Sequence, residues 1–184
     1  MTATNGDRRR GNPGRRRIDA GKPARSARAK IQTIDELAKI AAEARAAGSQ
    51  VVLAHGVFDL VHVGHIRHLE SARRQGDVLI VTVTADAFVN KGPGRPAFTD
   101  ALRAEMLGAL EYVDWVGVNH ASDAMSAIQA IKPDAYVKGS DYADSAADVT
   151  GKIAEERKAV EAHGGRLRSE EHTSELQSHL NLVC

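Results

Sequence analysis

Cysteine and long apolar runs are what this 184-residue sequence most clearly lacks. Its one cysteine, Cys184, excludes a disulfide framework and a cysteine-rich metal site. No apolar stretch approaches the roughly 18 residues that a membrane-spanning helix needs, and no apolar segment of a signal peptide follows the charged N-terminus. We therefore expect a cytoplasmic protein that binds no membrane. Its length suffices for one domain with a core.

Basic residues are concentrated at the N-terminus. The first 30 residues hold ten Lys and Arg against two acidic residues, so the net charge of +1 combines a basic arm with a mildly acidic body. Residues 1–29 carry two arginine triplets and almost nothing apolar, which predicts a disordered arm. Such an arm is either a solvated tail or the product of a mis-assigned start, or it is a tether to nucleic acid. Composition favours the tail, so a nucleic-acid partner is not expected.

Helical and strand patterns alternate from Ile31 onward. Thr33 can cap the first helix with Glu36 as its partner in a capping box. Short continuous apolar runs, typical of buried parallel strands, separate the helices. We predict helices over 33–48, 64–74, 99–110, 121–131 and 149–164, and strands over 51–54, 78–83, 113–118 and 134–138. This alternation predicts an α/β fold, a Rossmann-like doubly wound parallel sheet, over residues 30–167.

The last residues do not continue this pattern. Gly164–Leu167 begins what reads as a further strand, but the polar stretch from Arg168 corresponds to a common sequencing adapter translated in one frame. We therefore predict that residues 168–184 are a non-native tail on a C-terminally truncated domain. A genuine polar tail is the alternative.

One segment carries the chemistry: a buried strand runs into Gly56 and then into His62, Gly64 and His65 at the start of a helix. In an open parallel sheet, ligands bind at the carboxyl ends of the strands, where a helix N-terminus favours a phosphate. Gly56 allows close approach of the backbone, and Gly64 removes a side chain that would block a phosphate. Two imidazoles three residues apart can donate to phosphate oxygens whose charge grows during transfer. A zinc site would need further ligands, which the chain does not supply.

The segment Gly56-Val57-Phe58-Asp59, with His62-Val63-Gly64-His65 after it, resembles the signature of the cytidylyltransferase-like nucleotidyltransferases. The similarity runs from about residue 31 to 167. It is greatest to the nucleotidyltransferase domain of bifunctional ADP-heptose synthases, and glycerol-3-phosphate cytidylyltransferases are more distant. The resemblance implies that His62 and His65 are catalytic and that Gly56, Val57, Phe58 and Gly64 contact the nucleotide.

Three later blocks follow in the family's order. In the loop 90–96, the resemblance implies that Lys91 neutralises phosphate charge, with Arg95 a weaker candidate for the same role. Arg103, on the next helix, is implied in phosphate contact, with an exposed salt bridge as the alternative. The segment 137–142 resembles the family's K-G-x-D-(Y/W) block, which borders the base and ribose: Gly139 and Asp141 would hold the nucleoside, and Tyr142 would line the substrate site. Asp59 would contact the acceptor's hydroxyls or support a turn.

The resemblance implies an enzyme that transfers NMP from ATP or CTP to a small phosphorylated sugar or alcohol and releases pyrophosphate. Heptose-1-phosphate adenylyltransferase is the leading expectation, and CTP-dependent alcohol-phosphate cytidylyltransferase is the alternative. Mg²⁺ is expected with the NTP, not from a ligand cluster in the sequence. Relatives are sometimes fused to a sugar kinase, and the sequence leaves a homodimer open. The family's later I-S-S-T-like motif is missing, so we expect this polypeptide to be poorly active. A non-catalytic nucleotide-binding module with a tethering arm is the alternative from another functional class.

Overall fold

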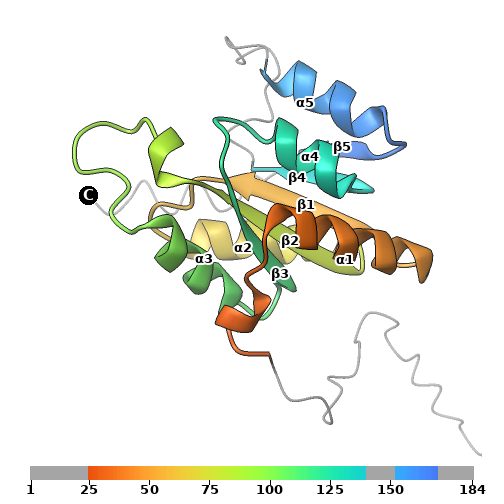
Figure 1. Cartoon of the computed structure of the whole chain (residues 1–184), viewed down its shortest axis with the longest axis horizontal. Helices are drawn as coiled ribbons and strands as arrows, with labels where there is room; N and C mark the ends of the chain where they lie inside the picture. Colours follow the sequence, from red (N-terminus) through yellow and green to blue (C-terminus); the bar gives the residue numbers. More distant parts are fainter. Residues whose placement is uncertain (1–24, 140–151, 170–184) are drawn as a thin grey trace, which may run out of the picture.

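The computed structural model of the chain describes residues 25–139 and 152–169. Five strands and five α-helices alternate in this part of the chain (Figure 1). The strands are β1 (Val51–Gly56), β2 (Val78–Thr84), β3 (Trp115–Asn119), β4 (Ala135–Lys138) and β5 (Arg166–Ser169). The helices are α1 (Ile34–Ala46), α2 (Val63–Arg73), α3 (Asp100–Gly108), α4 (Met125–Ile131) and α5 (Lys152–Glu161), with 3₁₀ turns η1 (Arg28–Lys30) and η2 (Asp86–Phe88).

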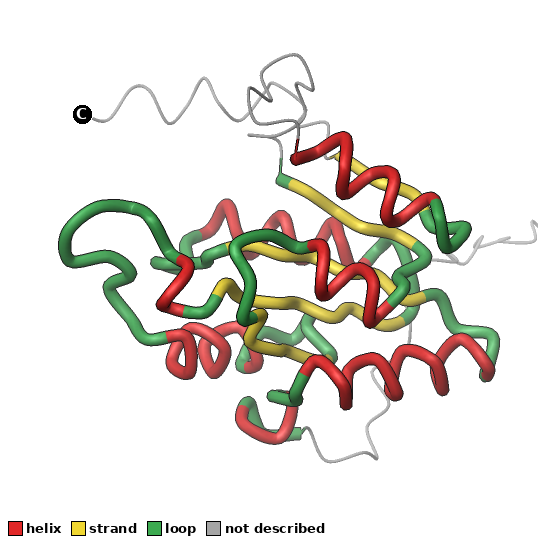
Figure 2. The backbone as a smooth tube through the Cα atoms, turned by 45° about the horizontal axis from the view of Figure 1, so that its top comes forward, coloured by secondary structure: helices red, strands yellow, loops and turns green. Residues whose placement is uncertain are grey.

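The five strands form one parallel sheet in the order β3-β2-β1-β4-β5. Helices cover both faces, as the tube in Figure 2 shows. Alternate strand residues pack against α2 and α3 on one face, where Leu69 and Leu107 are fully buried, and against α1, α4 and α5 on the other, where Leu37 and Ile128 are. The predicted doubly wound α/β fold is therefore confirmed.

The predicted cap of α1 is also confirmed. The Thr33 hydroxyl accepts from the Glu36 backbone N–H at 3.2 Å, and the Glu36 carboxylate accepts from the Thr33 backbone N–H at 2.8 Å. The hydrogen bonds with Thr33 lower the pKa of Glu36 below its ordinary value.

The predicted helix 121–131 begins later than the sequence pattern indicates, at Met125. Asp123 causes the delay because its carboxylate accepts from the Met125 N–H at 3.1 Å, and its carbonyl accepts from the Asn119 amide at 2.6 Å. Side chains of this kind compete with helical backbone bonds.

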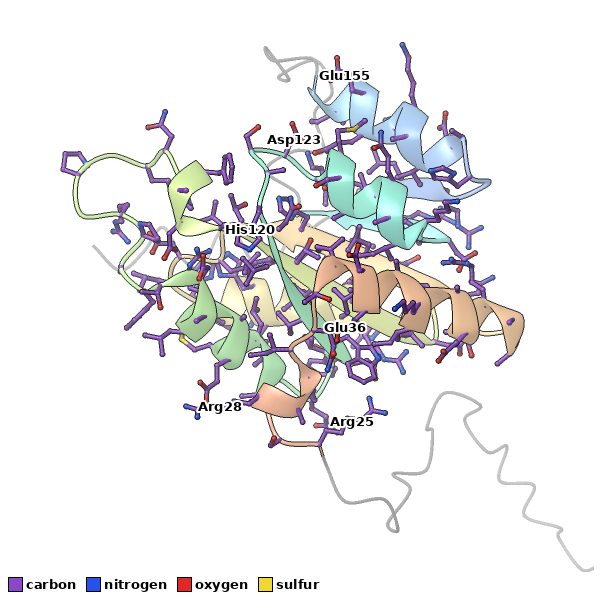
Figure 3. All side chains as sticks on the ribbon, viewed as in Figure 1. Arg25, Arg28, Glu36, His120, Asp123 and Glu155 are labelled. Carbon is purple, nitrogen blue, oxygen red and sulfur yellow. The ribbon has the colours of Figure 1, made fainter. Side chains whose placement is uncertain are left out.

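Residues 25–29, assigned to the disordered arm, pack against the domain. The Arg28 guanidinium donates to Glu105 on α3 at 2.9 Å, and Arg25 lies over the Trp115 ring, 4.1 Å from its centroid (Figure 3). Contacts with α3 and β3 thus order a segment whose own composition predicts disorder. None of the helices in the described ranges has the length and apolar character that crossing a bilayer requires.

Candidate active site

The candidate site lies at β1, where the order in which the chain adds strands to the sheet reverses. β1 pairs with β2 on one side and with β4 on the other, so the chain crosses to opposite sides of β1. This is the switch point at which open α/β sheets bind ligands. Ala54 of β1 pairs with Val137 of β4. Two residues further along, Gly56 is the last residue of β1 and Gly139 is the first residue after β4. The loop after β1 and Gly139 after β4 therefore lie at the same edge of the sheet.

His62 and His65 lie side by side at the start of α2. Their ring centroids are 3.9 Å apart with the planes tilted by 30°. His62 Nδ1 accepts from the Gly64 N–H at 3.1 Å, and His65 Nδ1 lies 3.4 Å from the His62 N–H. The two histidines therefore form a capping box at the N-terminus of α2, like the one that Thr33 and Glu36 form at α1. Since each Nδ1 is an acceptor, the proton of each neutral ring is on Nε2.

The charge of His65 is set by its surroundings. His65 is half-buried, and burial, followed by the neighbouring His62 ring, lowers its pKa below the ordinary value. A neutral His65 keeps Nδ1 available as the acceptor for the cap. The pair is thus fixed as two oriented donors, the arrangement that stabilises developing phosphate charge.

Gly64 and Phe58 shape the space around the pair. A Cβ on Gly64 would lie 2.8 Å from His62 Cε1, so the glycine makes room for the imidazole itself. Phe58 is 6% exposed and packs edge-on against His65, with ring centroids 5.2 Å apart. Its backbone is left-handed, with φ of 49°, a conformation that costs a bulky residue about 1–2 kcal/mol and that clusters at functional sites. A Cβ on Gly56 would lie 3.2 Å from the Phe58 ring.

Asp59 is buried and joins two loops. Its carboxylate accepts from the Arg95 guanidinium at 2.8 Å and from the Ala97 backbone N–H at 2.6 Å. These bonds, that of Ala97 first, lower the pKa of Asp59, so the carboxylate stays ionised. Of the two roles predicted for Asp59, this geometry favours the structural one. Arg95, predicted to contact phosphate, uses one of its guanidinium nitrogens, Nη1, to donate to Asp59.

Lys91 lies in the loop between η2 and α3, which extends from the sheet as a long arc (Figure 2). Gly92 and Gly94 on either side of Pro93 have φ of 91° and 73°, which explains the glycines of this loop. Lys91 is exposed, and with Arg95, His62, His65, Phe58, Asp59 and Leu60 it lines an open cavity of about 620 Å³. The structure therefore brings together the predicted catalytic residues His62, His65 and Lys91.

Arg103 occupies a place that neither predicted role describes. It is 0% exposed, and its guanidinium donates to the carbonyls of Phe98, Val57 and Thr84 and to the Asp86 carboxylate, at 2.5–3.0 Å. A phosphate contact needs an exposed guanidinium face, and a surface salt bridge needs an exposed side chain. Its partners instead lie in two connections, Val57 between β1 and α2, and Thr84, Asp86 and Phe98 between the end of β2 and α3.

The segment after β4 is described only to Gly139, where a Cβ would meet no atom within 4 Å. Asp141 and Tyr142 lie outside the described residues, and their roles stay predictions.

His55 is a residue of this edge that the sequence argument did not single out. Its Nδ1 lies 2.9 Å from the Thr82 hydroxyl and its Nε2 3.3 Å from the Thr84 hydroxyl. Burial, with the nearby Lys138 cation, lowers its pKa to about 4. The signal for it was a histidine at the end of an apolar strand, with two threonines spaced two apart at the end of the next.

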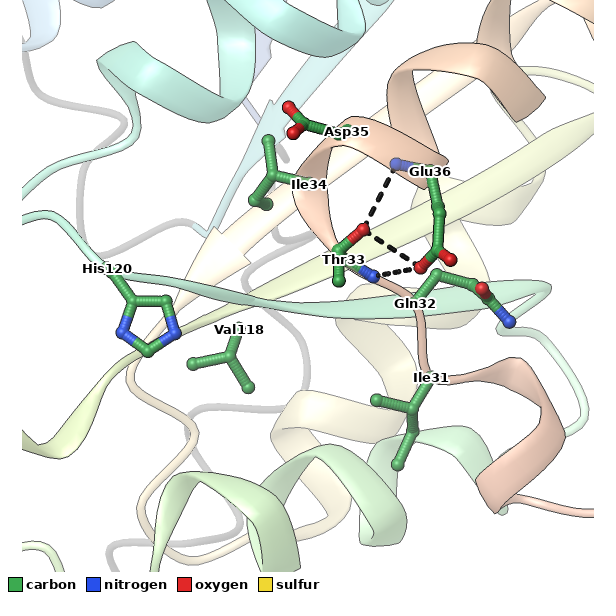
Figure 4. A pocket seen from close by; sticks show the side chains of 8 residues that line it. All are labelled: Ile31, Gln32, Thr33, Ile34, Asp35, Glu36, Val118 and His120. Carbon is green, nitrogen blue, oxygen red and sulfur yellow. Dashed lines mark hydrogen bonds between the residues drawn. The ribbon is translucent and has the colours of Figure 1, made fainter.

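A second hollow of about 450 Å³ lies at the start of α1, beside the outer strand β3 (Figure 4). Ile31, Ile34 and Val118 give it an apolar lining, and the Thr33–Glu36 cap forms one wall. It holds none of the predicted site residues. The described residues also contain no group of three or more His, Cys, Asp or Glu arranged to hold a metal ion.

Comparison with known proteins shows the family to which this chain belongs. A protein-family model described as Cytidylyltransferase-like matches residues 53–179. The chain is 38% identical over 151 residues to a "Bifunctional protein HldE" of Citrifermentans bemidjiense, a match covering 81% of this chain and 30% of that protein. It is 41% identical over 139 residues to the protein of the same name in Aliarcobacter butzleri, covering 74% and 29%. The chain thus spans less than a third of the length of these relatives.

Among solved structures, the chain resembles a lipopolysaccharide core biosynthesis protein from Thermoplasma volcanium. The TM-score is 0.54 at 29% identity, over 66% of this chain and 94% of that one. The predicted fold is confirmed, and so is the resemblance to cytidylyltransferase-like proteins that the sequence motifs indicated. Because the family model matches well over half of the chain, with the paired histidines inside the matched range, the chain belongs to the cytidylyltransferase-like family.

Proposed function

We propose that this domain transfers the NMP group of an NTP to the phosphate of a small phosphorylated sugar, with release of pyrophosphate. The observation that carries the proposal is the cavity in which two oriented imidazole donors face an exposed lysine. The likeness to proteins named bifunctional HldE, together with the sequence resemblance to ADP-heptose synthases, supports ATP as donor and a heptose 1-phosphate as acceptor.

In the proposed reaction, an acceptor phosphate oxygen attacks the α-phosphorus in line with the leaving pyrophosphate. The new P–O bond forms as the bond to the β-phosphate bridging oxygen breaks. Nε2–H of His62 and of His65 donate to oxygens that gain charge in the transition state. Lys91 balances phosphate charge across the cavity, and Gly139 and Asp141 hold the nucleoside.

The donor is proposed to enter as its Mg²⁺ complex, with the ion bound by phosphate oxygens. The described carboxylate of the cavity, Asp59, already accepts from Arg95 and Ala97, so the metal belongs to the substrate in this scheme. A sugar kinase would supply the phosphorylated acceptor, either as a further domain or as a separate protein. The reaction is proposed to occur in the cytoplasm, where NTPs are made.

The test is pyrophosphate release with each of ATP, CTP, GTP and UTP, paired with heptose 1-phosphate and glycerol 3-phosphate. We expect slow but measurable turnover with ATP and the sugar phosphate, whereas preference for CTP with glycerol phosphate would support the cytidylyltransferase alternative. His62→Ala is expected to lower kcat on the order of 10²-fold or more, as removal of other preorganised donors does. His163→Ala, at an exposed histidine in the turn after α5, is the matched control. A loss below threefold in His62→Ala would contradict its role.

A further inference from the structure

The guanidinium of Arg103 is a junction between three segments of the site. Its Nη1 donates to the Val57 carbonyl, in the loop that leads to His62 and His65. Its Nη2 donates to the carbonyl of Thr84, the last residue of β2, at 2.7 Å and to the carboxylate of Asp86, in η2, at 2.6 Å. Its Nε donates to the Phe98 carbonyl at 3.0 Å, where the loop carrying Lys91 ends.

The chemistry of these contacts is specific to arginine. Burying a cation costs several kcal/mol unless it is paired and hydrogen-bonded, and Asp86 supplies the opposite charge. The other three acceptors are backbone carbonyls, so Arg103 holds the main chain of each segment at a set position. A planar guanidinium presents donors in a rigid fork, whereas a lysine ammonium is a single point of charge.

Asp59 completes the connection from the solvent side. It lies in the β1–α2 loop and holds Arg95 and Ala97 of the other loop. The two loops that face each other across the cavity are therefore tied twice: by Asp59 at the cavity wall, and by Arg103 beneath it.

We propose that Arg103 is a positioning residue, which fixes the loop carrying Lys91 relative to the loop carrying His62 and His65 and so forms the phosphate cavity before substrate binds. The catalytic part of this inference rests on the proposed function, and the structural part does not. Preformed donors cost no reorganisation during the reaction, and a displacement of about 1 Å can cost on the order of 10²-fold in rate.

Amide hydrogen exchange on the free chain tests the structural part. Arg103→Lys keeps the charge and removes the fork, and Leu107→Ala, one turn along α3 and fully buried, is the control for lost stability. We expect Arg103→Lys to speed exchange about tenfold in residues 57–62 and 86–98 relative to Leu107→Ala. Equal exchange in those segments for the two variants would overturn the proposal. This measurement needs no turnover, so it stands even if no NTP is used.

A double-mutant cycle with Lys91→Ala tests the catalytic part. We expect Arg103→Lys to lower kcat on the order of 10²-fold in the wild type but less than tenfold in Lys91→Ala, because the loop then carries no lysine to place. Leu107→Ala should lower kcat equally in both backgrounds. Additive losses, or a change confined to KM for the NTP as expected of a phosphate ligand, would contradict positioning. If the wild type releases no pyrophosphate with any pair of substrates, the proposed function fails, and hydrogen exchange still decides the role of Arg103.

Guanidinium rescue is a second test in the Arg103→Ala variant. The substitution leaves a guanidinium-shaped space bordered by three carbonyls and a carboxylate. We expect millimolar guanidinium chloride to raise kcat at least fivefold and sodium chloride at equal ionic strength to have no effect. Absence of rescue in a variant that remains folded by circular dichroism would count against the proposal.

Discussion

At the scale of single residues, the two histidines have a structural role besides the catalytic one proposed for them. Three residues is the separation at which His65 Nδ1 reaches the backbone N–H of the N-cap His62, while His62 Nδ1 accepts from the Gly64 N–H in the first turn of α2. The same bonds that cap the helix therefore fix the tautomer of each ring. A substitution that shifts one ring without removing it should impair the reaction and leave the fold intact.

Gly64→Ala is such a substitution. The new Cβ would lie 2.8 Å from His62 Cε1, and the exposed His62 ring is free to move away. Replacing glycine in a helix favours folding by up to about 1 kcal/mol, which offsets the loss of the cap bond from the displaced His62 ring, so the melting temperature should change little. We expect kcat to fall about tenfold to 10²-fold. Unchanged kcat with an unchanged melting temperature would show that the ring position matters little.

His55 should make the domain sensitive to acid. Its pKa is about 4 in the folded chain, below the ordinary value of 6.5, so the unfolded chain takes up the proton first as pH falls. The stability that a neutral His55 contributes is complete above pH 6.5 and is lost progressively down to pH 4. Between pH 7.5 and 5.0 the loss is on the order of 2 kcal/mol.

Urea unfolding at these two pH values, for the wild type and for His55→Gln, measures this loss. Both proteins contain the other histidines and carboxylates, so the difference between them isolates His55. The variant should lose about 2 kcal/mol less than the wild type. An equal fall in the free energy of unfolding would contradict a neutral, buried His55.

At the scale of elements, sequence patterns predicted most of what the structure contains. The apolar runs gave all of the strands up to β4 because strands buried on both faces leave an uninterrupted signal. The cap at Thr33 was predictable because its partner is three residues away. The start of α4 was not, because Asp123 bonds to Asn119, a residue of the preceding strand.

The environment of Arg103 was unpredictable for a similar reason. Three of its four acceptors are backbone carbonyls, up to 46 residues away, and a carbonyl leaves no mark in the sequence. The grouping of His62, His65 and Lys91 around one cavity was predictable because their order in the chain is that of a family.

The capping box of α1 makes a prediction at this scale. Thr33→Ala removes the acceptor for the Glu36 N–H and should lower the free energy of unfolding by about 1 kcal/mol. Because the pKa of Glu36 is lowered, the contribution of its carboxylate is present at neutral pH and is lost as pH falls through that pKa. Chemical denaturation at pH 7.5 would measure the cost. Turnover should be unchanged, since α1 lies outside the cavity, and a change in kcat would argue against this separation.

At the scale of the whole molecule, the two loops around the cavity and the five-stranded sheet form one unit, to which a short N-terminal segment also belongs. Gln32 donates its N–H to the Val116 carbonyl at 2.8 Å, and Ile31 forms a parallel bridge with Val116. Lys30 donates to the carbonyls of Leu110 and Val113 at 3.0 and 2.8 Å. A deletion that tests whether the basic arm tethers nucleic acid must therefore keep the residues that make these contacts.

Deleting residues 1–24 should leave turnover unchanged if the arm is a tail. Binding of a nucleic-acid duplex by the full chain that disappears on deletion would instead support the tether. Deleting residues 1–32 is expected to lower the melting temperature and to produce aggregates visible by light scattering, whatever the arm does. A monodisperse 1–32 deletion would show that the segment 25–32 is dispensable.

The expected aggregation follows from where Ile31 and Gln32 lie. β3 is an outer strand of the sheet, and an uncovered outer strand offers a row of N–H and C=O groups to any extended chain that meets it. By occupying Val116, the two residues shorten that row, and the side chains of Arg25 and Lys30 place positive charge beside it. The segment 25–32, which joins the arm to the domain, thus also hinders the edge-to-edge pairing of β3 with another molecule.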